Sequence, residues 1–388
     1  MPQLSRRVKS IKPFMVMTVL ERALALERQG IDVVHFEIGE PDFDTPQLVR
    51  ETACQQIRAG ATHYTHSRGM PELRERIAAF NRDTRGVTFD PVSEILVSGG
   101  TSPLFLMALG AILNPGDEVL VCDPGYPCYE NFVEFFQGRV VRVPVYEDHR
   151  FDVTPEAIQA GITDKTRAIL LNSPSNPTGQ INSEEILRII ADLATDHDFW
   201  IISDEIYAGI AYDNIKVPSI TAIGGVRDRT VLLDGFSKFY AMTGWRLGYT
   251  CAPTPLVDDM VKIQQNFFIC PPSISQHAGL AAFECGVDTS AMVAEYARRR
   301  ALIVRGLNEL PGVHCLTPAG AFYAFANVRE ISTNSLSLSR DLLEKAHVAT
   351  TPGVVFGPHG EGYLRFSFAT SLDHIHEGLA RLRKYLTR

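Results

Sequence analysis

One lysine stands among residue types that could bind a carbonyl compound carrying a phosphate. Lys238 directly follows Ser237, and Arg246 comes shortly after it. Burial and a neighbouring arginine both lower the pKa of a lysine, and a neutral amine can attack a carbonyl carbon. Serine and arginine supply a hydrogen-bond donor and a bidentate charge for phosphate. The trio indicates pyridoxal 5′-phosphate (PLP), whereas a lone lysine would more often be an ordinary surface residue.

Buried strands are expected to hold this lysine in place. The apolar run 230–234 predicts a strand before Lys238, and the run 246–251 predicts another after it. Small residues between them let the backbone approach a ligand closely. Upstream, strands alternate with helices, which is typical of a mostly parallel α/β sheet. The strands are expected at 94–98, 118–123, 139–145, 167–173, 200–206 and 230–236.

The rest of the chain predicts a division into domains. Residues 1–15 show neither helical nor strand periodicity, and a short strand is expected over 33–38. Helices are expected at 18–29, 46–59, 71–84 and 290–310, and the tail mixes strands at 321–328 and 363–369 with helices. We therefore expect an N-terminal arm and part of a small domain over 1–45. A large PLP-binding domain would span 46–285, and a small α+β domain would span 286–388.

A glycine turn offers a second half for the phosphate site. Gly99, Gly100 and Thr101 lie between the strand at 94–98 and a helix expected over 102–113. Free N–H groups and the positive end of the dipole favour anions at a helix start. Gly-Gly-Thr is also a common strand-to-helix turn. With Ser237 and Arg246, the turn would complete a cup for phosphate.

Three further positions could act on a cofactor ring and a substrate. Asp204 ends a strand, where a carboxylate beneath a pyridine nitrogen keeps that nitrogen protonated, so that the ring accepts electrons. Tyr207 would place its phenol near the ring oxygen. Arg365 interrupts an apolar strand, where it needs a carboxylate partner. That partner is either an internal ion pair or the α-carboxylate of a substrate. The alternatives are a helix N-cap or a salt bridge for Asp204, and core packing for Tyr207.

The segment 235–248, Gly-Phe-Ser-Lys-Phe-Tyr-Ala-Met-Thr-Gly-Trp-Arg-Leu-Gly, carries a family resemblance. It resembles the lysine segment of the class I/II, fold-type I PLP-dependent aminotransferases, and the likeness runs over nearly the whole chain. The resemblance implies the α/β PLP-transferase fold type I. That fold has a large domain with a mostly parallel, seven-stranded sheet between helices, and a smaller α+β domain.

The resemblance also implies an activity and roles for single residues. Lys238 would hold PLP as an aldimine and move a proton as general base and then acid. An amino group would thereby pass between an L-amino acid and a 2-oxo acid, within amino acid metabolism. Tyr126 would stack on the ring, and Asn176 would offer its amide to the ring oxygen and to the substrate. The backbone at Gly39 would meet the carboxylate bound by Arg365.

Tyr64 matches a family tyrosine that reaches the phosphate of a neighbouring subunit. The resemblance therefore implies a homodimer with shared active sites. Gly235 stands where some members have a phosphate-binding serine, a contact for which Ser237 could compensate. No second cation for a distal carboxylate can be placed from the sequence.

Other functions remain open at this point. A PLP-dependent C–S β-lyase would share every residue named above. A non-catalytic PLP-binding regulatory module usually carries a DNA-binding domain, for which the segment before residue 18 is short. A plain nucleotide-binding α/β protein is also possible, but GxGxxG and GxxxxGK[ST] are both missing.

The composition excludes several partners. A net charge of −8 and the lack of a long Lys/Arg run argue against nucleic acid. No run of apolar residues is long enough to span a membrane. The seven cysteines form no CxxC pair, which favours reduced thiols in a cytoplasm. The histidines form no HxH or HxxxH set, so no metal site is expected.

Overall fold

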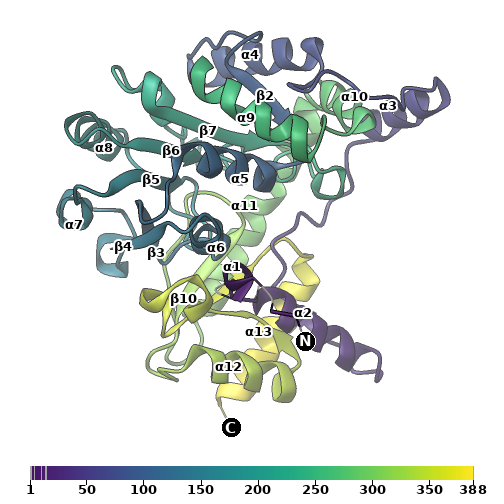
Figure 1. Ribbon diagram of the computed structural model, residues 1–388. Coiled ribbons are helices and arrows are strands. Elements are labelled where there is room, and N and C mark those ends of the chain that lie inside the picture. The colour runs from purple at the N-terminus through teal and green to yellow at the C-terminus, as the bar shows by residue number, and fades with distance from the viewer. Residues whose placement is uncertain (1, 4, 10, 14, 388) are drawn as a thin grey trace.

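The computed structural model describes residues 2–3, 5–9, 11–13 and 15–387 of the chain. Its largest element is a seven-stranded sheet with helices on both faces (Figure 1). Strand β8 runs antiparallel to β2 and β7, and the other neighbours in this sheet are parallel. All six strands expected upstream of Lys238 are present, each within two residues of its expected start and end. The order is β2 (Ile95–Ser98), β8 (Gly248–Cys251), β7 (Thr230–Gly235), β6 (Trp200–Asp204), β5 (Thr166–Asn172), β3 (Glu118–Asp123) and β4 (Arg139–Pro144).

Alternating strand residues bury the two faces of this sheet. Ala168 and Leu170 of β5 belong to one apolar cluster, and Ile169 and Leu171 belong to another. This period of two is the one that a pleated strand imposes. The first cluster is covered by α5 (Thr101–Ile112), α6 (Cys128–Phe135) and α9 (Thr254–Phe267), and the second by α7 (Pro155–Gly161) and α8 (Glu184–Asp196).

A further group of helices covers the β2–β8 end of the sheet. Its apolar cluster includes Leu73, Phe236, Tyr249 and Ala278. Pro71 opens the helix α4, a position where its missing N–H costs nothing, and Gly86 ends it with a φ of 74°. The group consists of α3 (Gln47–Arg58), α4 (Pro71–Arg85) and α10 (Ser273–Ala282), with α3 and α10 at the upper right of Figure 1.

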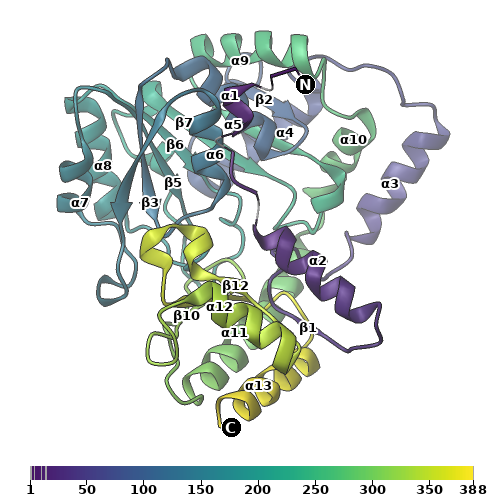
Figure 2. The ribbon, with the colours of Figure 1, turned by 60° about the horizontal axis from the view of Figure 1, so that its bottom comes forward.

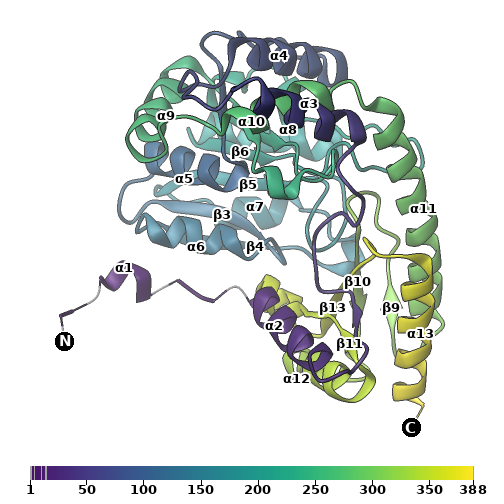
Figure 3. The ribbon, with the colours of Figure 1, turned by 90° about the vertical axis from the view of Figure 1, so that its right-hand side faces the viewer.

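The C-terminal part forms a smaller antiparallel sheet with its own apolar core. The sheet order is β12 (Thr351–Pro352), β13 (Tyr363–Ser367), β10 (Tyr323–Asn327) and β9 (His314–Cys315). The helix α11 runs along the side of the molecule from the large sheet toward the small one (Figure 3). The helices are α11 (Gly286–Asn308), α12 (Ser335–Asp341), the π-helical turn η5 (Leu342–Ala346) and α13 (Leu372–Leu386). We propose domain boundaries at residues 45 and 285, which assign one of these two sheets to each domain.

The N-terminal segment lies beside both parts. The strand expected over 33–38 is only β1 (Val34–His35), which pairs in parallel with β11 (Val348–Ala349). The arm expected to lack helical structure contains the short helix α1 (Arg6–Lys9), and α2 (Met15–Glu27) starts earlier than expected. Figure 2 shows α2 near the edge where the two parts meet. Short 3₁₀ turns are Glu147–His149, Ile220–Ala222, Arg227–Arg229, Thr243–Trp245, Gly353–Phe356 and Pro358–Gly360.

None of the described helices combines the length and the apolarity needed to cross a bilayer. All seven cysteines are free thiols.

Candidate active site

A cavity of about 320 Å³ lies where the strands β5, β6 and β7 end. Parallel strands direct their carboxyl ends to one edge of a sheet, which is where ligands of such sheets bind. The small sheet adds β10 and β13 to the wall, and α2 adds apolar side chains. Ten of the residues predicted for the site line the cavity: Gly39, Thr101, Tyr126, Asn176, Asp204, Tyr207, Ser237, Lys238, Arg246 and Arg365.

Lys238 follows β7 and points its amine across the cavity. Its Nζ donates a hydrogen bond to the carbonyl oxygen of Gly39 at 2.7 Å. Burial lowers the pKa of Lys238 to about 8; Glu40 opposes this shift, and Arg365 and Arg246 add to it. A substantial fraction of the amine is therefore neutral near pH 8 and can act as a nucleophile or a base.

Asp204 ends β6 with its carboxylate on the cavity wall. The hydroxyl of Tyr129 donates to its Oδ2 at 2.6 Å, and the N–H of Ile206 donates to its Oδ1 at 3.2 Å. Burial raises the pKa of Asp204 to about 6, and the two hydrogen bonds oppose this shift. One hydrogen bond therefore orients each oxygen of the carboxylate.

An anion site is formed where α5 begins. Thr101 is the first residue of the helix and has no side-chain cap, so the helix start presents free N–H groups to the cavity. The guanidinium of Arg246 lies beside Gly100, whose φ is 98°. A Cβ on residue 100 would lie 2.6 Å from Nη2 of Arg246. A Cβ on Gly235 would lie 3.0 Å from the backbone of Gly248 and of Leu247, so a serine there would require these neighbours to shift by a few tenths of an ångström.

Arg365 lies on β13 and is only 3 % exposed. Among the described residues it forms no ion pair; its donors reach neutral oxygens of Asn176 (3.2 Å), Thr351 (3.1 Å) and the Glu37 backbone. Its buried Nε has no hydrogen-bond partner. The internal ion pair that the sequence left open for Arg365 is therefore absent among the described residues. A buried guanidinium without a carboxylate favours an anionic ligand.

Aromatic side chains connect the two sheets at this site. The hydroxyls of Tyr207 and Tyr323 lie 2.8 Å apart, and the Tyr323 ring stacks under the guanidinium of Arg365 at 4.5 Å. Asn176 receives the guanidinium hydrogen bond on its Oδ1. Its Nδ2 is left for an acceptor in the cavity.

Three predicted residues lie outside the cavity wall. Gly99 and Gly100 do not line the cavity; they form the turn that leads into α5. Tyr64 is 79 % exposed.

The sequence interpretation missed two tyrosines and one wall of the site. Tyr129 follows Tyr126 by nearly one helical turn, and this spacing could have identified it. No sequence signal singles out Tyr323 among the residues of β10. The wall contributed by α2 consists of Val16, Met17 and Leu20. Val16 and Met17 precede the helix expected over 18–29, and Leu20 fits the ordinary apolar pattern of an amphipathic helix.

The donors present fit PLP. The start of α5 and Arg246 suit a phosphate, the Asp204 carboxylate suits a protonated ring nitrogen, and Lys238 supplies an amine for the aldehyde. Because Gly100 has no Cβ, the backbone there and the guanidinium of Arg246 can both lie close to one anion. No cluster of metal-ligating side chains occurs within the described ranges.

Comparison with known proteins gives a consistent result. A family model, aminotransferase class I and II, matches residues 31–382. The (5-formylfuran-3-yl)methyl phosphate transaminase of Methanocaldococcus jannaschii is 40 % identical, with 99 % of this chain and 100 % of that protein covered. The aromatic-amino-acid aminotransferase 2 of Thermococcus litoralis is 37 % identical, over 99 % and 98 %. The structure of aspartate aminotransferase from Thermus thermophilus with maleate superposes with a TM-score of 0.94, at 37 % identity and full coverage of both chains.

Proposed function

The chain belongs to the class I and II aminotransferases, which transfer amino groups with PLP, and on this premise we propose that its substrate is an L-amino acid with an apolar side chain. The named relatives act on different compounds, so family membership leaves the substrate open. One observation carries the site assignment. A lysine amine and a buried arginine without a carboxylate partner face the same cavity.

This proposal assigns roles to the three cations of the described cavity wall, to Asp204 and to Tyr323. Arg365 binds the α-carboxylate of the substrate with two charge-assisted hydrogen bonds, and its stacking on Tyr323 fixes the plane of the fork. Lys238 accepts the proton from the α-carbon as a general base and then returns it as a general acid. PLP, when bound, supplies an electron-accepting ring. Asp204 holds the proton on the ring nitrogen, and the start of α5 with Arg246 holds the phosphate.

The cavity wall supports an apolar substrate side chain. The cations on the described wall are Lys238, Arg246 and Arg365, and each already has a role. Glu40 adds a negative charge. Burying a second carboxylate without a partner would be costly. The apolar side chains on the wall are Val16, Met17, Leu20, Ile38, Phe105 and Phe132, and the further neutral polar ones include Ser102, Asn172 and Thr243.

A substrate screen tests this function. Purified protein with added PLP is assayed with single amino acids, using pyruvate and 2-oxoglutarate as acceptors. We expect kcat/KM for aromatic or large aliphatic donors to exceed that for aspartate by at least about tenfold. Pyruvate should be the better acceptor, because both half-reactions use one site. A preference for aspartate would contradict the proposed substrate class, and an absence of transfer from every donor would contradict the site assignment.

We also propose a homodimer with shared sites. Tyr64 is exposed, and so are Phe267, Phe268 and Ile269 just before α10. The two regions are joined, because Gln276 of α10 donates to the hydroxyl of Thr65 at 2.8 Å. Exposed apolar side chains around one tyrosine support a protein interface there. The seven free thiols support a cytoplasmic location.

A further inference from the structure

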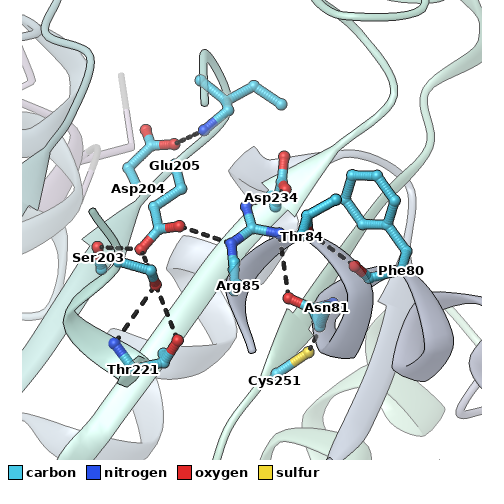
Figure 4. Close-up of polar contacts among 12 residues, drawn as sticks. Phe80, Asn81, Thr84, Arg85, Ser203, Asp204, Glu205, Thr221, Asp234 and Cys251 are labelled. Carbon is cyan, nitrogen blue, oxygen red and sulfur yellow. Dashed lines mark hydrogen bonds and ion pairs between the residues drawn. The ribbon is translucent and has the colours of Figure 1, made fainter. Parts of the chain in front are cut away.

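Arg85 is the centre of a buried polar network behind the active site (Figure 4). It is the last residue of α4, and its guanidinium is bonded on all three nitrogens. Nε donates to Glu205 Oε2 at 2.8 Å, Nη2 donates to Asp234 Oδ2 at 2.6 Å, and Nη1 donates to Asn81 Oδ1 at 3.1 Å. Both carboxylates are buried, at 2 % and 7 % exposure.

Neutral donors complete the network but do not balance its charge. Ser203 and Ser219 donate to Glu205 Oε1 at 3.2 and 2.6 Å. The hydroxyl of Tyr249 and the N–H of Gly235 donate to Asp234 at 2.9 and 2.6 Å. Within the described chain, Arg85 is the only cation paired with either carboxylate. One positive charge against two negative charges leaves the cluster at −1.

The two carboxylates adjoin the residues assigned to the chemistry. Glu205 directly follows Asp204, and Asp234 lies near the end of β7, four residues before Lys238. The strands are in register here, with Asp204 opposite Leu233 and the Glu205 N–H bonded to the Leu233 carbonyl at 2.8 Å. A single guanidinium therefore ties together the ends of the two strands that carry Asp204 and Lys238.

The charge of this cluster acts on Asp204. Burial is the main cause of the raised pKa of Asp204, and Asp234 and Glu205 raise it further. Other titratable groups of the described chain that interact with this carboxylate include Tyr129 of α6, Tyr126 and Lys238. Loss of the Arg85 charge would leave two negative charges uncompensated next to Asp204.

We propose that Arg85 is a positioning residue, which holds the ends of β6 and β7 together and keeps Asp204 ionised toward the cofactor nitrogen. This inference depends on the proposed role of Asp204. It assigns a role in the reaction to a residue that does not line the cavity.

Charge-changing variants test the inference through the colour of the bound cofactor. The absorbance of PLP joined to a lysine changes when the linkage loses its proton, and a positive ring nitrogen lowers the pH of that change. Arg85→Gln should raise the midpoint pH of this absorbance change by at least about 0.5 unit. It should also lower kcat/KM about tenfold. Asp234→Asn, which removes one negative charge, should move the midpoint downward. The double variant Arg85→Gln/Asp234→Asn restores the net charge and should return the midpoint toward that of the parent.

Matched controls separate this role from a structural one. Arg82→Gln changes an exposed arginine on the same helix that pairs only with Asp83 and should leave the midpoint unchanged. Arg85→Lys keeps the charge and should leave the midpoint close to that of the parent. If Arg85→Gln does not fold, Asp234→Asn alone tests the effect of charge. A merely structural role would give shifts of the same sign in Arg85→Gln and Asp234→Asn, or none, and would overturn the inference. A parent protein without a coloured, pH-dependent band would instead contradict the proposed function.

Discussion

The amine of Lys238 and the carbonyl oxygen of Gly39 lie 2.7 Å apart. The hydrogen bond joins the loop after β7 to the segment after β1, which belong to opposite sides of the cavity. The neighbouring carbonyl at Glu37 receives a hydrogen bond from Arg365. The same short segment therefore orients both the amine and the guanidinium, and this gives the lysine a defined direction before any ligand arrives.

The lowered pKa of Lys238 predicts how its reactivity depends on pH. Apoprotein mixed with PLP should form the coloured adduct at a rate that rises with pH to a midpoint of about 8, because only the neutral amine attacks. An ordinary lysine would show a midpoint near 10.5. Stopped-flow absorbance measures the rate. Lys238→Ala should form no adduct and transfer no amino groups, whereas exposed Lys262→Ala should behave as the parent. Full activity of Lys238→Ala would refute the assignment.

Arg365 predicts a separation of substrate binding from cofactor binding. Arg365→Lys keeps the charge but loses the fork, so kcat/KM for amino acids should fall about 30- to 1,000-fold. PLP affinity, followed by absorbance, should stay close to that of the parent. Amines without a carboxylate should lose little rate. Arg329→Lys, a change at an arginine outside the cavity wall, is the control. Loss of PLP with unchanged relative rates for amino acids and amines would identify Arg365 as structural.

Tyr64 predicts complementation between subunits. Tyr64→Ala and Lys238→Ala should each be strongly impaired at limiting PLP. Mixed dimers contain one site with both native residues, so random mixing should restore about a quarter of the parent activity. Sedimentation measures the oligomeric state alongside the assay. A fully active monomer would contradict the dimer proposal.

His35 predicts a pH-dependent part of the stability. Its Nδ1 lies 2.7 Å from Glu37 and its Nε2 lies 3.1 Å from Glu27 at the end of α2. The hydrogen bond to Glu37 is the main cause that raises the pKa of His35 from 6.5 to about 9. The folded-state pKa is the higher one. The stabilisation is therefore complete below pH 6.5 and is lost as the pH rises through about 9.

Urea unfolding of the parent and of His35→Gln between pH 6 and pH 10 measures this effect. The difference in unfolding free energy should be largest at pH 6 and should shrink toward pH 10. His376→Gln, at an exposed position of α13, should show no such trend. A difference that stays constant over this range would contradict the assignment to His35.

The large sheet and its site were predictable because local patterns specify both. Runs such as 168–171 are apolar on both faces, which marks buried parallel strands, and Lys238 and Asp204 follow directly from strand ends. Tyr323 and the α2 wall could not be predicted, because they reach the cavity through packing between distant segments. The length of the strand expected over 33–38 was overestimated: β1 has two residues, because an apolar run does not show how many of its backbone groups pair with another strand.

Arg365 donates to the backbone of Glu37 across 328 positions of sequence. During synthesis, the segment that orients Lys238 therefore remains without its partner Arg365 until β13 has left the ribosome. The large sheet can form earlier, because its strands lie between residues 95 and 251. The cavity is thus assembled last, and a nascent chain arrested before β13 would have the lysine but not the pocket that directs it.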